Sequence, residues 1–411
     1  MKKSAKCLFN FLLFGAVINV SAQVEINGLL DVEFSKGGKD SDFYLNGIAS
    51  DFKETHVAIN QLNLFLFSQI SDAWSVNVRL QFDTWVSGEL NPLRLSLAEI
   101  VWEPPDDRIR IDAGRFVNPF GLYSQRQLSI QNSFVNTPLA YGYGLNMTNQ
   151  HGYIFNYDSV SIDPGGYGYG TGKLTTIAYY GYSTGLMFSW LIVPEVLNLD
   201  LAITNVAPTS QKQYTNLNNL GGIARLSIQP AIFWQQGISF ATGSFMESGD
   251  VNKDYTDLNK FKQTVYGTDW IIAYTYFEIS GEFIYAVWNV PGYDQAWFET
   301  DNDGNLKEFK LENYSYYIDL KYEPSFVPGS YLAVRYEELK FLEYNETQGY
   351  YQTEPGMQFN WGDDIRRYSI AFGYKFSPNI LFKIAYSDQK YINADWQPET
   401  YTIRSTLSAS F

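Results

Sequence analysis

The stretch from Trp74 to Asp83 alternates between apolar and polar side chains along its whole length. A period of two places the apolar side chains on one face of a β-strand and the polar ones on the other. The apolar face holds Trp74, Val76, Val78, Leu80 and Phe82, and the polar face holds Ser75, Asn77, Arg79, Gln81 and Asp83. A tilted strand needs about 9–11 residues to cross a membrane. The stretch therefore has the pattern and the length of a strand in a transmembrane β-barrel.

The same alternation returns in the C-terminal part of the chain, in residues 313–322, 365–376, 380–389 and 400–411. In 400–411 the apolar face ends with the aromatic residue Phe411. A half-buried strand of a soluble sheet would alternate in the same way. A soluble sandwich, however, seldom keeps strands so long and so regular.

Short turns and long loops alternate between these stretches. The turns at 71–72 and 377–379 are short, and long loops fill residues 36–55, 247–264, 289–312 and 340–364. Outer-membrane barrels have short periplasmic turns, longer extracellular loops and both ends in the periplasm. We therefore predict an all-β fold, an antiparallel barrel of sixteen strands. The expected strands are 24–35, 57–69, 74–85, 94–103, 108–115, 184–192, 197–206, 222–229, 236–246, 265–275, 277–288, 313–322, 330–339, 365–376, 380–389 and 400–411.

Aromatic residues support this orientation. They make up 17% of the chain, with 32 Tyr and 10 Trp. Transmembrane barrels carry aromatic girdles at both membrane interfaces. Periplasmic strand ends are predicted for Trp74, Trp102, Tyr322, Phe376 and Phe411, and outer strand ends for Trp85 and Trp288.

Residues 116–183 interrupt the pattern between the fifth and sixth strands. Residues 151–158 and 173–182 could form an added hairpin and give eighteen strands, but one long loop is favoured. In a barrel of this size such a loop can fold inward and narrow the lumen, here around residues 116–150 and at most to 183. Its candidate constriction residues are Arg115, Asn118, Pro119, Phe120, Gly121 and Arg126. Residues 115–121 could instead form a surface turn.

The N-terminus has the composition of a secretory signal. Three lysines precede an apolar stretch at residues 8–20, and Val20-Ser21-Ala22 resembles a cleavage site. We expect residues 1–22 to be removed, together with Cys7, the only cysteine, and residues 23–411 to form the barrel. Without the three signal lysines, 26 basic and 44 acidic residues leave a net charge of −18, which argues against a nucleic-acid partner.

Charged residues on the predicted polar faces would line the lumen. The candidate pore-lining residues are Arg79, Asp83, Arg110, Asp112, Glu282, Arg367, Lys375, Lys383 and Arg404. The last four form a basic stripe on consecutive strands, with no acid beside them on that face. Opposed basic and acidic walls would orient dipolar solutes, whereas charges that pair across the lumen would only stiffen it. Both interpretations remain open.

Two motifs resemble the phosphate-selective porin O and P family of outer-membrane proteins. Residues 113–122, AGRFVNPFGL, are similar to the Gly-Arg/Lys-Phe…Pro-Phe-Gly segment of that family. Residues 202–208, AITNVAP, resemble its Ala-Val-Thr-Asn-Gly-Ala-Pro strand end, with Val206 in place of the usual glycine. The resemblance implies a trimeric barrel of sixteen strands. It does not carry phosphate selectivity over, because the family relies on lysines at the constriction and residues 116–150 contain none.

Other functional classes have weaker support. A His-based enzyme site would have to use His56 or His151, and neither lies in a nucleophile motif. Asp301 and Asp303 are spaced like the start of a calcium loop, but Lys310 stands where such a loop needs a glutamate. We expect no cofactor. A secreted β-rich adhesin or glycan-binding protein and an outer-membrane barrel enzyme are the alternatives.

These observations favour a passive porin of the bacterial outer membrane. Its expected partners are outer-membrane lipid and lipopolysaccharide, small solutes, two further copies in a homotrimer and the barrel-insertion machinery. Phe411 is the expected assembly signal for that machinery.

Overall fold

The computed structural model describes most of the chain. The described residues are 23–45, 52–83, 93–145, 147–148, 152–153, 174–178, 181–210, 220–245, 258–291, 293–294, 297–298, 308–345, 358–392 and 397–411. The expected signal at 1–22, His151 and the pair Asp301 and Asp303 lie outside the described residues. Trp85, an expected girdle residue, lies outside them too.

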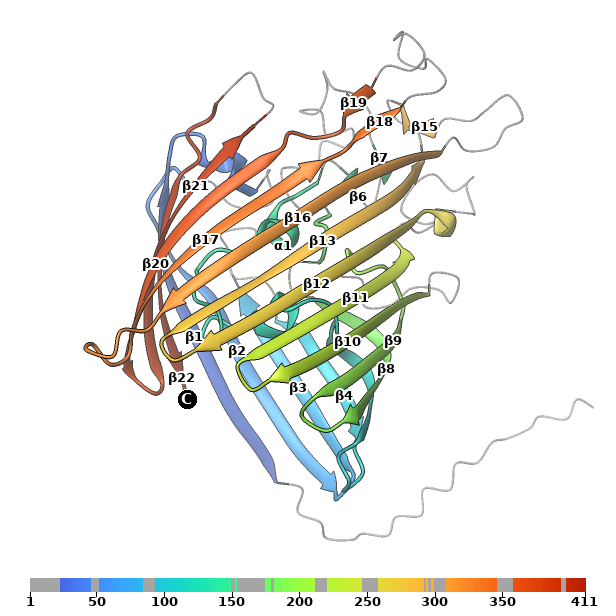
Figure 1. Ribbon diagram of the computed structural model, residues 1–411, viewed down its shortest axis with the longest axis vertical. Coiled ribbons are helices and arrows are strands. Elements are labelled where there is room, and N and C mark those ends of the chain that lie inside the picture. Colours follow the sequence, from blue (N-terminus) through green and yellow to red (C-terminus); the bar gives the residue numbers. More distant parts are fainter. Residues whose placement is uncertain are drawn as a thin grey trace, which may run out of the picture.

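Sixteen antiparallel strands close into one barrel, as the alternation predicts (Figure 1). They are β1 (Val24–Gly37), β2 (His56–Ser71), β3 (Trp74–Asp83), β4 (Arg94–Trp102), β5 (Ile109–Val117), β8 (Tyr182–Val193), β9 (Leu197–Thr204), β10 (Gly221–Ala231), β11 (Trp234–Ser244), β12 (Lys262–Tyr274), β13 (Phe277–Pro291), β16 (Glu308–Tyr322), β17 (Ser330–Phe341), β20 (Ile365–Ser377), β21 (Ile380–Tyr391) and β22 (Thr402–Ser410). Since β5 pairs directly with β8, the alternative of eighteen barrel strands is wrong.

Short elements occupy the connections. They are η1 (Ser41–Leu45), η2 (Tyr123–Arg126), α1 (Leu139–Gly142), β6 (Met147–Thr148), β7 (Gly152–Tyr153), η5 (Leu258–Lys260), β14 (Tyr293–Asp294), β15 (Trp297–Phe298), β18 (Glu343–Asn345) and β19 (Gln358–Asn360). No helix among the described residues is long and apolar enough to cross a membrane. We call the two ends of the barrel the short-turn end, where β1 begins and β22 ends, and the long-loop end.

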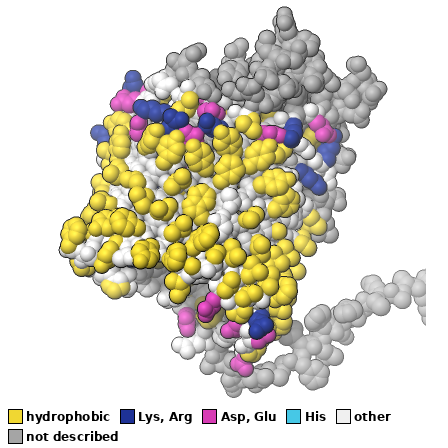
Figure 2. All heavy atoms as spheres, viewed as in Figure 1, with side chains coloured by type: hydrophobic (Ala, Val, Ile, Leu, Met, Phe, Trp, Pro, Cys, Tyr) yellow, Lys and Arg dark blue, Asp and Glu magenta, His cyan; other side chains and the backbone are white. Residues whose placement is uncertain are grey.

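The two faces of each strand differ as expected. On β22, Ile403 and Leu407 are exposed on the outside, whereas Arg404 and Ser408 are buried inside. Figure 2 shows apolar side chains over most of the outer face, with charged ones gathered near the ends. Burial of polar side chains inside and exposure of apolar ones outside is the inverse of a soluble protein and suits a barrel surrounded by lipid.

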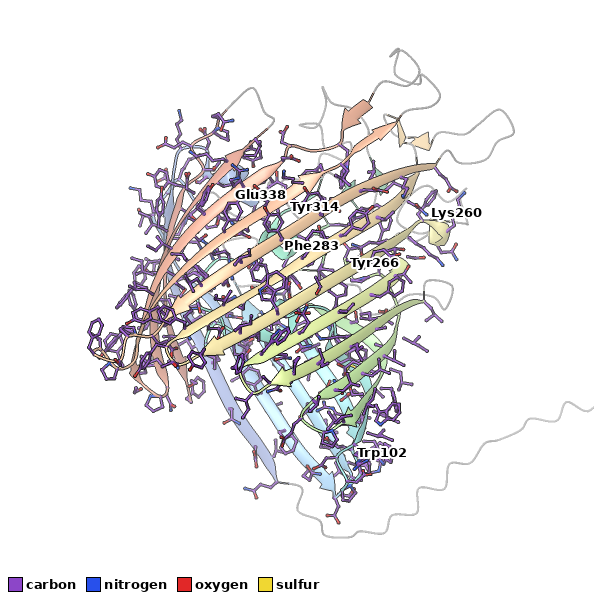
Figure 3. The ribbon with its side chains drawn as sticks, in the orientation of Figure 1. Trp102, Lys260, Tyr266, Phe283, Tyr314 and Glu338 are labelled. Atoms are coloured by element: carbon purple, nitrogen blue, oxygen red, sulfur yellow. The ribbon has the colours of Figure 1, made fainter. Side chains whose placement is uncertain are left out.

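Aromatic rings gather on the outside near the long-loop end. Phe240 and Tyr266 lie 5.3 Å apart, Phe283 and Tyr314 5.9 Å apart, and Tyr336 contacts Tyr368 at 5.1 Å (Figure 3). We call the rings on the outside of β11–β21 the outer belt. At the short-turn end, Trp74 pairs with Trp102 in the register of β3 and β4. The predicted girdle at the short-turn end is therefore present in part, whereas the rings of the outer belt are not the residues predicted for the outer girdle.

Trp288 is a correction to the predicted outer girdle. Its side chain is fully buried inside the barrel, where it donates from Nε1 to Asn313 Oδ1 at 3.0 Å and meets the Phe245 ring edge-on. On β13, Trp288 shares the inner face with Glu282 and Ile284. The inner face of this strand therefore becomes apolar toward the long-loop end.

The barrel closes between β1 and β22. Beyond the last paired residues of these strands, Gly28 N–H donates to Phe411 O at 2.7 Å and Phe411 N–H donates to Gly28 O at 3.0 Å. The Phe411 ring lies over Gly28 on the outer surface, in the space that a Cβ at this position would occupy. An aromatic ring over a glycine restores the apolar cover that the missing side chain leaves, and here it covers the seam.

We predict that Gly28→Val displaces the Phe411 ring and lowers the stability of the folded barrel by about 1 kcal/mol. The urea midpoint of the gel-mobility shift that marks the folded barrel measures this change. Phe411→Ala removes the same contact between the ring and Gly28. The double variant Gly28→Val/Phe411→Ala should therefore lose little more stability than either single variant. Gly222→Val is the control, since a Cβ there meets nothing closer than 3.8 Å. Additive effects of the two changes would contradict the contact.

Candidate functional site

After β5 the chain turns into the barrel instead of continuing outward. Residues 118–124, which include Asn118, Pro119, Phe120 and Gly121, are all buried. Gly121 has a φ of +67°, and a Cβ there would lie 2.7 Å from a carboxylate oxygen of Glu282 and 2.8 Å from the Tyr141 hydroxyl. Only glycine accommodates both this dihedral angle and this contact easily. We call residues 118–145 the internal loop.

Glu282, on the inner face of β13, is the main polar anchor of the internal loop. Its Oε1 accepts the N–H groups of Leu122 and Tyr123, the latter at 2.6 Å, and its Oε2 accepts the Tyr141 hydroxyl at 3.0 Å. Burial and the neighbouring Glu282 raise the pKa of Tyr141 well above its usual range, so the hydroxyl keeps its proton and donates. A buried carboxylate with three donors is well satisfied.

Apolar packing reinforces this anchor. The Phe120 ring fills the space above Gly267 of β12, and Phe120, Leu139 and Tyr141 form one buried cluster with Val265 and Ile284. The apolar inner face of β12 and β13 therefore contacts chain rather than a water-filled lumen.

Lys383 of β21 binds the part of the internal loop from Ser129 to Phe134. Its ammonium group donates to the carbonyl oxygens of Ser129, Asn132 and Phe134 at 2.7, 3.0 and 3.2 Å. An ammonium has three hydrogens, and all three find an acceptor here. The Ser129 hydroxyl also donates to Asp31 of β1 at 2.7 Å.

Arg404 and Arg367 each contact an acid on a neighbouring strand as well as the internal loop. Arg404 donates to both carboxylate oxygens of Glu33 at 2.6 and 2.9 Å, and to Asn136 Oδ1 at 3.0 Å. Arg367 donates to Glu337 at 2.6 Å and to the Thr137 carbonyl at 2.5 Å.

The predicted basic stripe without neighbouring acids is therefore wrong for these two arginines. Glu33 reaches Arg404 across the seam, and Glu337 lies on β17, paired with Arg367 in register. Of the four predicted residues, Lys375 is exposed near the short-turn end. The interpretation in which charges pair and stiffen the wall describes this side of the barrel.

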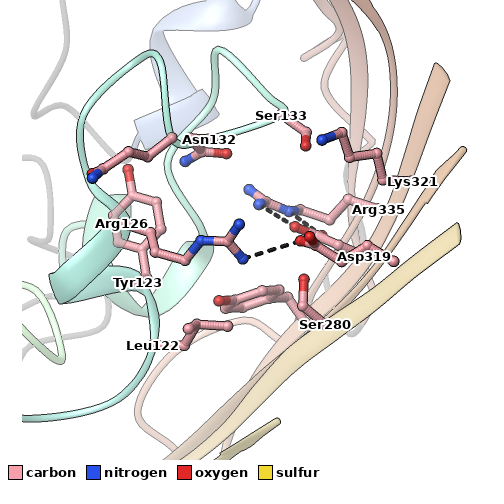
Figure 4. Close-up of a pocket in the computed structure, with 12 residues that line it drawn as sticks. Leu122, Tyr123, Arg126, Asn132, Ser133, Ser280, Asp319, Lys321 and Arg335 are labelled. Atoms are coloured by element: carbon pink, nitrogen blue, oxygen red, sulfur yellow. Dashed lines mark hydrogen bonds and ion pairs between the residues drawn. The ribbon is translucent and has the colours of Figure 1, made fainter. Parts of the chain in front are cut away.

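A small cavity lies between the internal loop and the wall formed by β13, β16 and β17 (Figure 4). Arg126 Nη1 contacts Glu278 at 3.0 Å along one side, and Arg335 binds Asp319 with two hydrogen bonds of 2.6 and 2.7 Å along the other. The cavity volume of about 30 Å³ is on the scale of a water molecule. This part of the lumen leaves no room for a solute.

The wall formed by β3, β4, β5 and β8 carries the other predicted arginines. Arg79 Nε donates to Asn63 Oδ1 at 2.9 Å, and Arg79 Nη1 also donates to the Tyr182 hydroxyl. Arg115 lies in β5 rather than in the internal loop; its Nε donates to the Ser96 carbonyl at 3.0 Å, and its guanidinium lies 5.5 Å from the Tyr182 ring centre.

Nearer the short-turn end, Arg110 bridges Asp112 at 2.6 Å and Glu99 at 3.2 Å. Asp83 is the last residue of β3, and His56 is the first residue of β2 at the long-loop end.

The contacts between the internal loop and the wall thus fall on β11, β12, β13, β17, β20, β21, β22 and β1. The loop is held against one side of the barrel. The inner faces of β2–β5 and β8–β10, which we call the open sector, carry none of these contacts, although Asn63, Gln81 and Asp112 are buried toward the middle of the barrel. Inner-face residues of the open sector near the short-turn end, such as Gln69 and Gln229, are exposed to solvent.

Sequence reasoning named Glu282 and Lys383 as lumen residues but missed their contacts with the loop. It also missed two residues of the internal loop, Asn136, which accepts a hydrogen bond from Arg404, and Ser129, which donates one to Asp31. Most of the loop atoms that contact Glu282 and Lys383 are backbone N–H and carbonyl groups. Every residue carries such groups, so no sequence signal marks these contacts.

Neither a family profile nor a curated protein matches the sequence. Solved structures do match. An anion-selective porin from Comamonas acidovorans has a TM-score of 0.57 at 8% identity, covering 95% of this chain and 100% of that chain. The outer membrane channel DcaP of Acinetobacter baumannii has a TM-score of 0.56 at 13% identity, covering 95% and 97%. The trimer form of OmpT, an outer membrane protein of Vibrio cholerae, has a TM-score of 0.54 at 8% identity, covering 95% and 99%.

At these identities the likeness concerns the fold alone. The chain has the fold of outer-membrane porins. The resemblance to the phosphate-selective porin O and P family stays a prediction.

We predict that Lys383→Met loosens the internal loop, because three carbonyl oxygens lose their donor; the cost is about 1–3 kcal/mol. Hydrogen–deuterium exchange of peptides from residues 118–145 should become faster than in the unchanged protein. Lys375→Met is the matched control, since Lys375 is exposed, and it should leave the exchange unchanged. Equal exchange in both variants would show that Lys383 does not hold the loop.

Proposed function

We propose that this protein is an outer-membrane porin, a passive diffusion channel for small hydrophilic solutes or ions. The observation that carries the proposal is a closed barrel of sixteen strands whose interior is narrowed, on one side, by an anchored loop. The apolar outer face with aromatic rings at both ends suits a bilayer. The polar open sector gives hydrophilic solutes a path.

The charge pairs inside the barrel favour a channel with weak ion preference. Several buried arginines have carboxylate partners, as Arg225 with Asp269, Arg335 with Asp319 and Arg404 with Glu33. A paired arginine presents little net charge to a passing anion. We therefore do not extend the proposal to phosphate selectivity.

The alternatives receive less support. A secreted adhesin would expose this apolar outer face to water, which soluble proteins avoid over large areas. An enzyme site would need a base close to a nucleophile. His56 lies at the end of β2, and among the described residues no group of acids, histidines and cysteines is arranged to hold a metal ion.

We further propose that residues 1–22 direct export and that Phe411 serves as the signal for barrel insertion. The protein would then lie among outer-membrane lipid and lipopolysaccharide. The position of Phe411 at the seam is consistent with a residue that the insertion machinery reads during closure.

A homotrimer that contacts itself through β1–β4 is part of the proposal. The outer belt is tyrosine-rich on the far side of the barrel, whereas the corresponding outer positions on β2 and β4 hold Val57, Ile59 and Leu95. Tyrosine suits the lipid interface because its ring is apolar and its hydroxyl is polar, and aliphatic side chains suit close packing against protein.

We predict that Val57→Trp separates the trimer into monomers, because the larger side chain does not fit a packed interface. Light scattering of the detergent-solubilised protein measures the mass. Val334→Trp, at an exposed valine on β17, should leave the trimer intact. A monomeric unchanged protein, or a trimer that tolerates Val57→Trp, would contradict the proposed interface.

Conductance measurements in planar bilayers test the porin itself. We expect discrete current steps from the full chain, and larger or flickering steps from Glu282→Ala, because three loop donors lose their acceptor and the loop can leave the wall. Asp106→Ala, in the exposed turn after β4, should leave the steps unchanged. The absence of steps in the unchanged protein would refute an open channel.

A further inference from the structure

A cleft of about 240 Å³ lies at the short-turn end of the open sector. It is formed by the ends of β8, β9, β10 and β11 and by η2 of the internal loop. Its polar lining on the lumen side consists of Gln125, Asn198, Asp200, Ser227, Gln229 and Gln235. Four of these six side chains are carboxamides, which each offer both donors and an acceptor.

The strand register holds this polar lining in place. Asn198 pairs with Ser227 across β9 and β10, and Asp200 pairs with Arg225 one step farther from the mouth. Asn198 Nδ2 donates to Asp200 Oδ2 at 2.9 Å. This bond fixes the amide, and its Oδ1 is buried with no hydrogen-bond partner among the described residues. A buried, unsatisfied acceptor in a cleft is suited to a ligand hydroxyl.

The internal loop supplies the opposite side of the cleft. Gln125 lies in η2, two residues after Tyr123, and the N–H groups of Leu122 and Tyr123 bind Glu282. The anchor that holds the loop therefore also positions Gln125 toward β9 and β10.

The charge of the cleft excludes anions. Among the described residues that line it, none is basic, whereas Asp200 and Glu195 are acidic. Arg225, which pairs with Asp200 in the strand register, has both Nη atoms on Asp269, at 2.5 and 2.7 Å, and its Nε on Ser227 at 3.0 Å. This arginine is neutralised by its partner and turned away from an incoming anion.

We propose that this cleft is a binding subsite for a small neutral polyhydroxylated solute, such as a single sugar ring, on its way through the lumen. The proposal rests on the porin function proposed above. Adjacent hydroxyls of a sugar can each donate to a carboxylate or amide oxygen and accept from an amide N–H. The cleft is smaller than the roughly 300–1,000 Å³ of pockets that hold drug-sized ligands, which suits one ring rather than a chain of them.

A cation is the competing occupant, because of the two acids. The lining opposes this: one oxygen of Asp200 already accepts the Asn198 amide, and apart from Glu195 the remaining groups are uncharged. Uncharged donors and acceptors in equal measure fit a solute that itself both donates and accepts.

Direct binding tests the subsite without requiring conductance. Saturation-transfer NMR with glucose on the folded, detergent-solubilised full chain should show contact. The combined change Asn198→Ala and Gln235→Ala should reduce that signal tenfold or more. Gln69→Ala, which removes an exposed inner amide on the opposite wall, should leave it intact. Asn198→Leu, which nearly keeps the shape of the side chain but has no oxygen acceptor, should also weaken binding, and as a single change it controls for misfolding of the double variant.

The outcomes separate the two proposals. Glucose contact that the Asn198 variants abolish supports the subsite even if no current steps are seen, in which case only the porin function fails. Current steps without glucose contact, or glucose contact unchanged by the variants, would overturn the subsite alone. Binding of the diamine putrescine in competition with glucose, lost in Asp200→Asn, would replace the sugar by a cation.

Discussion

Charges buried inside the barrel must be compensated, by a partner of opposite charge or by several hydrogen bonds, and the rest of the structure depends on how these partners are arranged. Removal of one member of a buried ion pair costs about 3–5 kcal/mol, because the other member stays buried and uncompensated. Arg404 meets this requirement with Glu33 across the seam, and Arg367 meets it with Glu337 on β17. Both arginines then use a remaining N–H group on the internal loop. Barrel closure and loop position are thus coupled through the same side chains.

This coupling decides where solutes can pass. The loop lies against β11–β13 through Glu282 and Phe120, and against β17–β22 through Lys383 and the two arginines. Arg335, Arg367, Lys383 and Arg404, on this side of the barrel, are therefore used for structure. Under the proposed function, solutes would pass along the open sector. Its inner faces carry amides, hydroxyls and charged side chains: Arg110 is paired there with Asp112 and Glu99, whereas the Arg115 guanidinium lies over the Tyr182 ring.

The strand pattern was largely predictable, and the contacts of the loop were not. A period of two identifies all sixteen barrel strands, since lipid outside and lumen inside impose it on each one. Trp288 was predicted to lie in the outer girdle because it stands near a strand end. It is an even number of residues from Glu282, however, and therefore lies on the inner face. Arg404 and Glu33 are 371 residues apart, so only the register across the seam reveals their bond. Glu282 binds backbone N–H groups, which every sequence contains and which therefore leave no signature.

Under the proposed function, selectivity would follow from hydrogen bonding more than from charge. In the open sector Arg110 is matched by Asp112 and Glu99, and the field of Arg225 is cancelled by Asp269. A nearly neutral wall neither concentrates nor repels ions strongly. The uncharged amides of the cleft then distinguish solutes. They do so by how many hydroxyl groups of the solute can replace the hydrogen bonds that the amides make with water. Because Gln125 reaches the cleft from the internal loop, the same Glu282 that narrows the lumen also sets this discrimination.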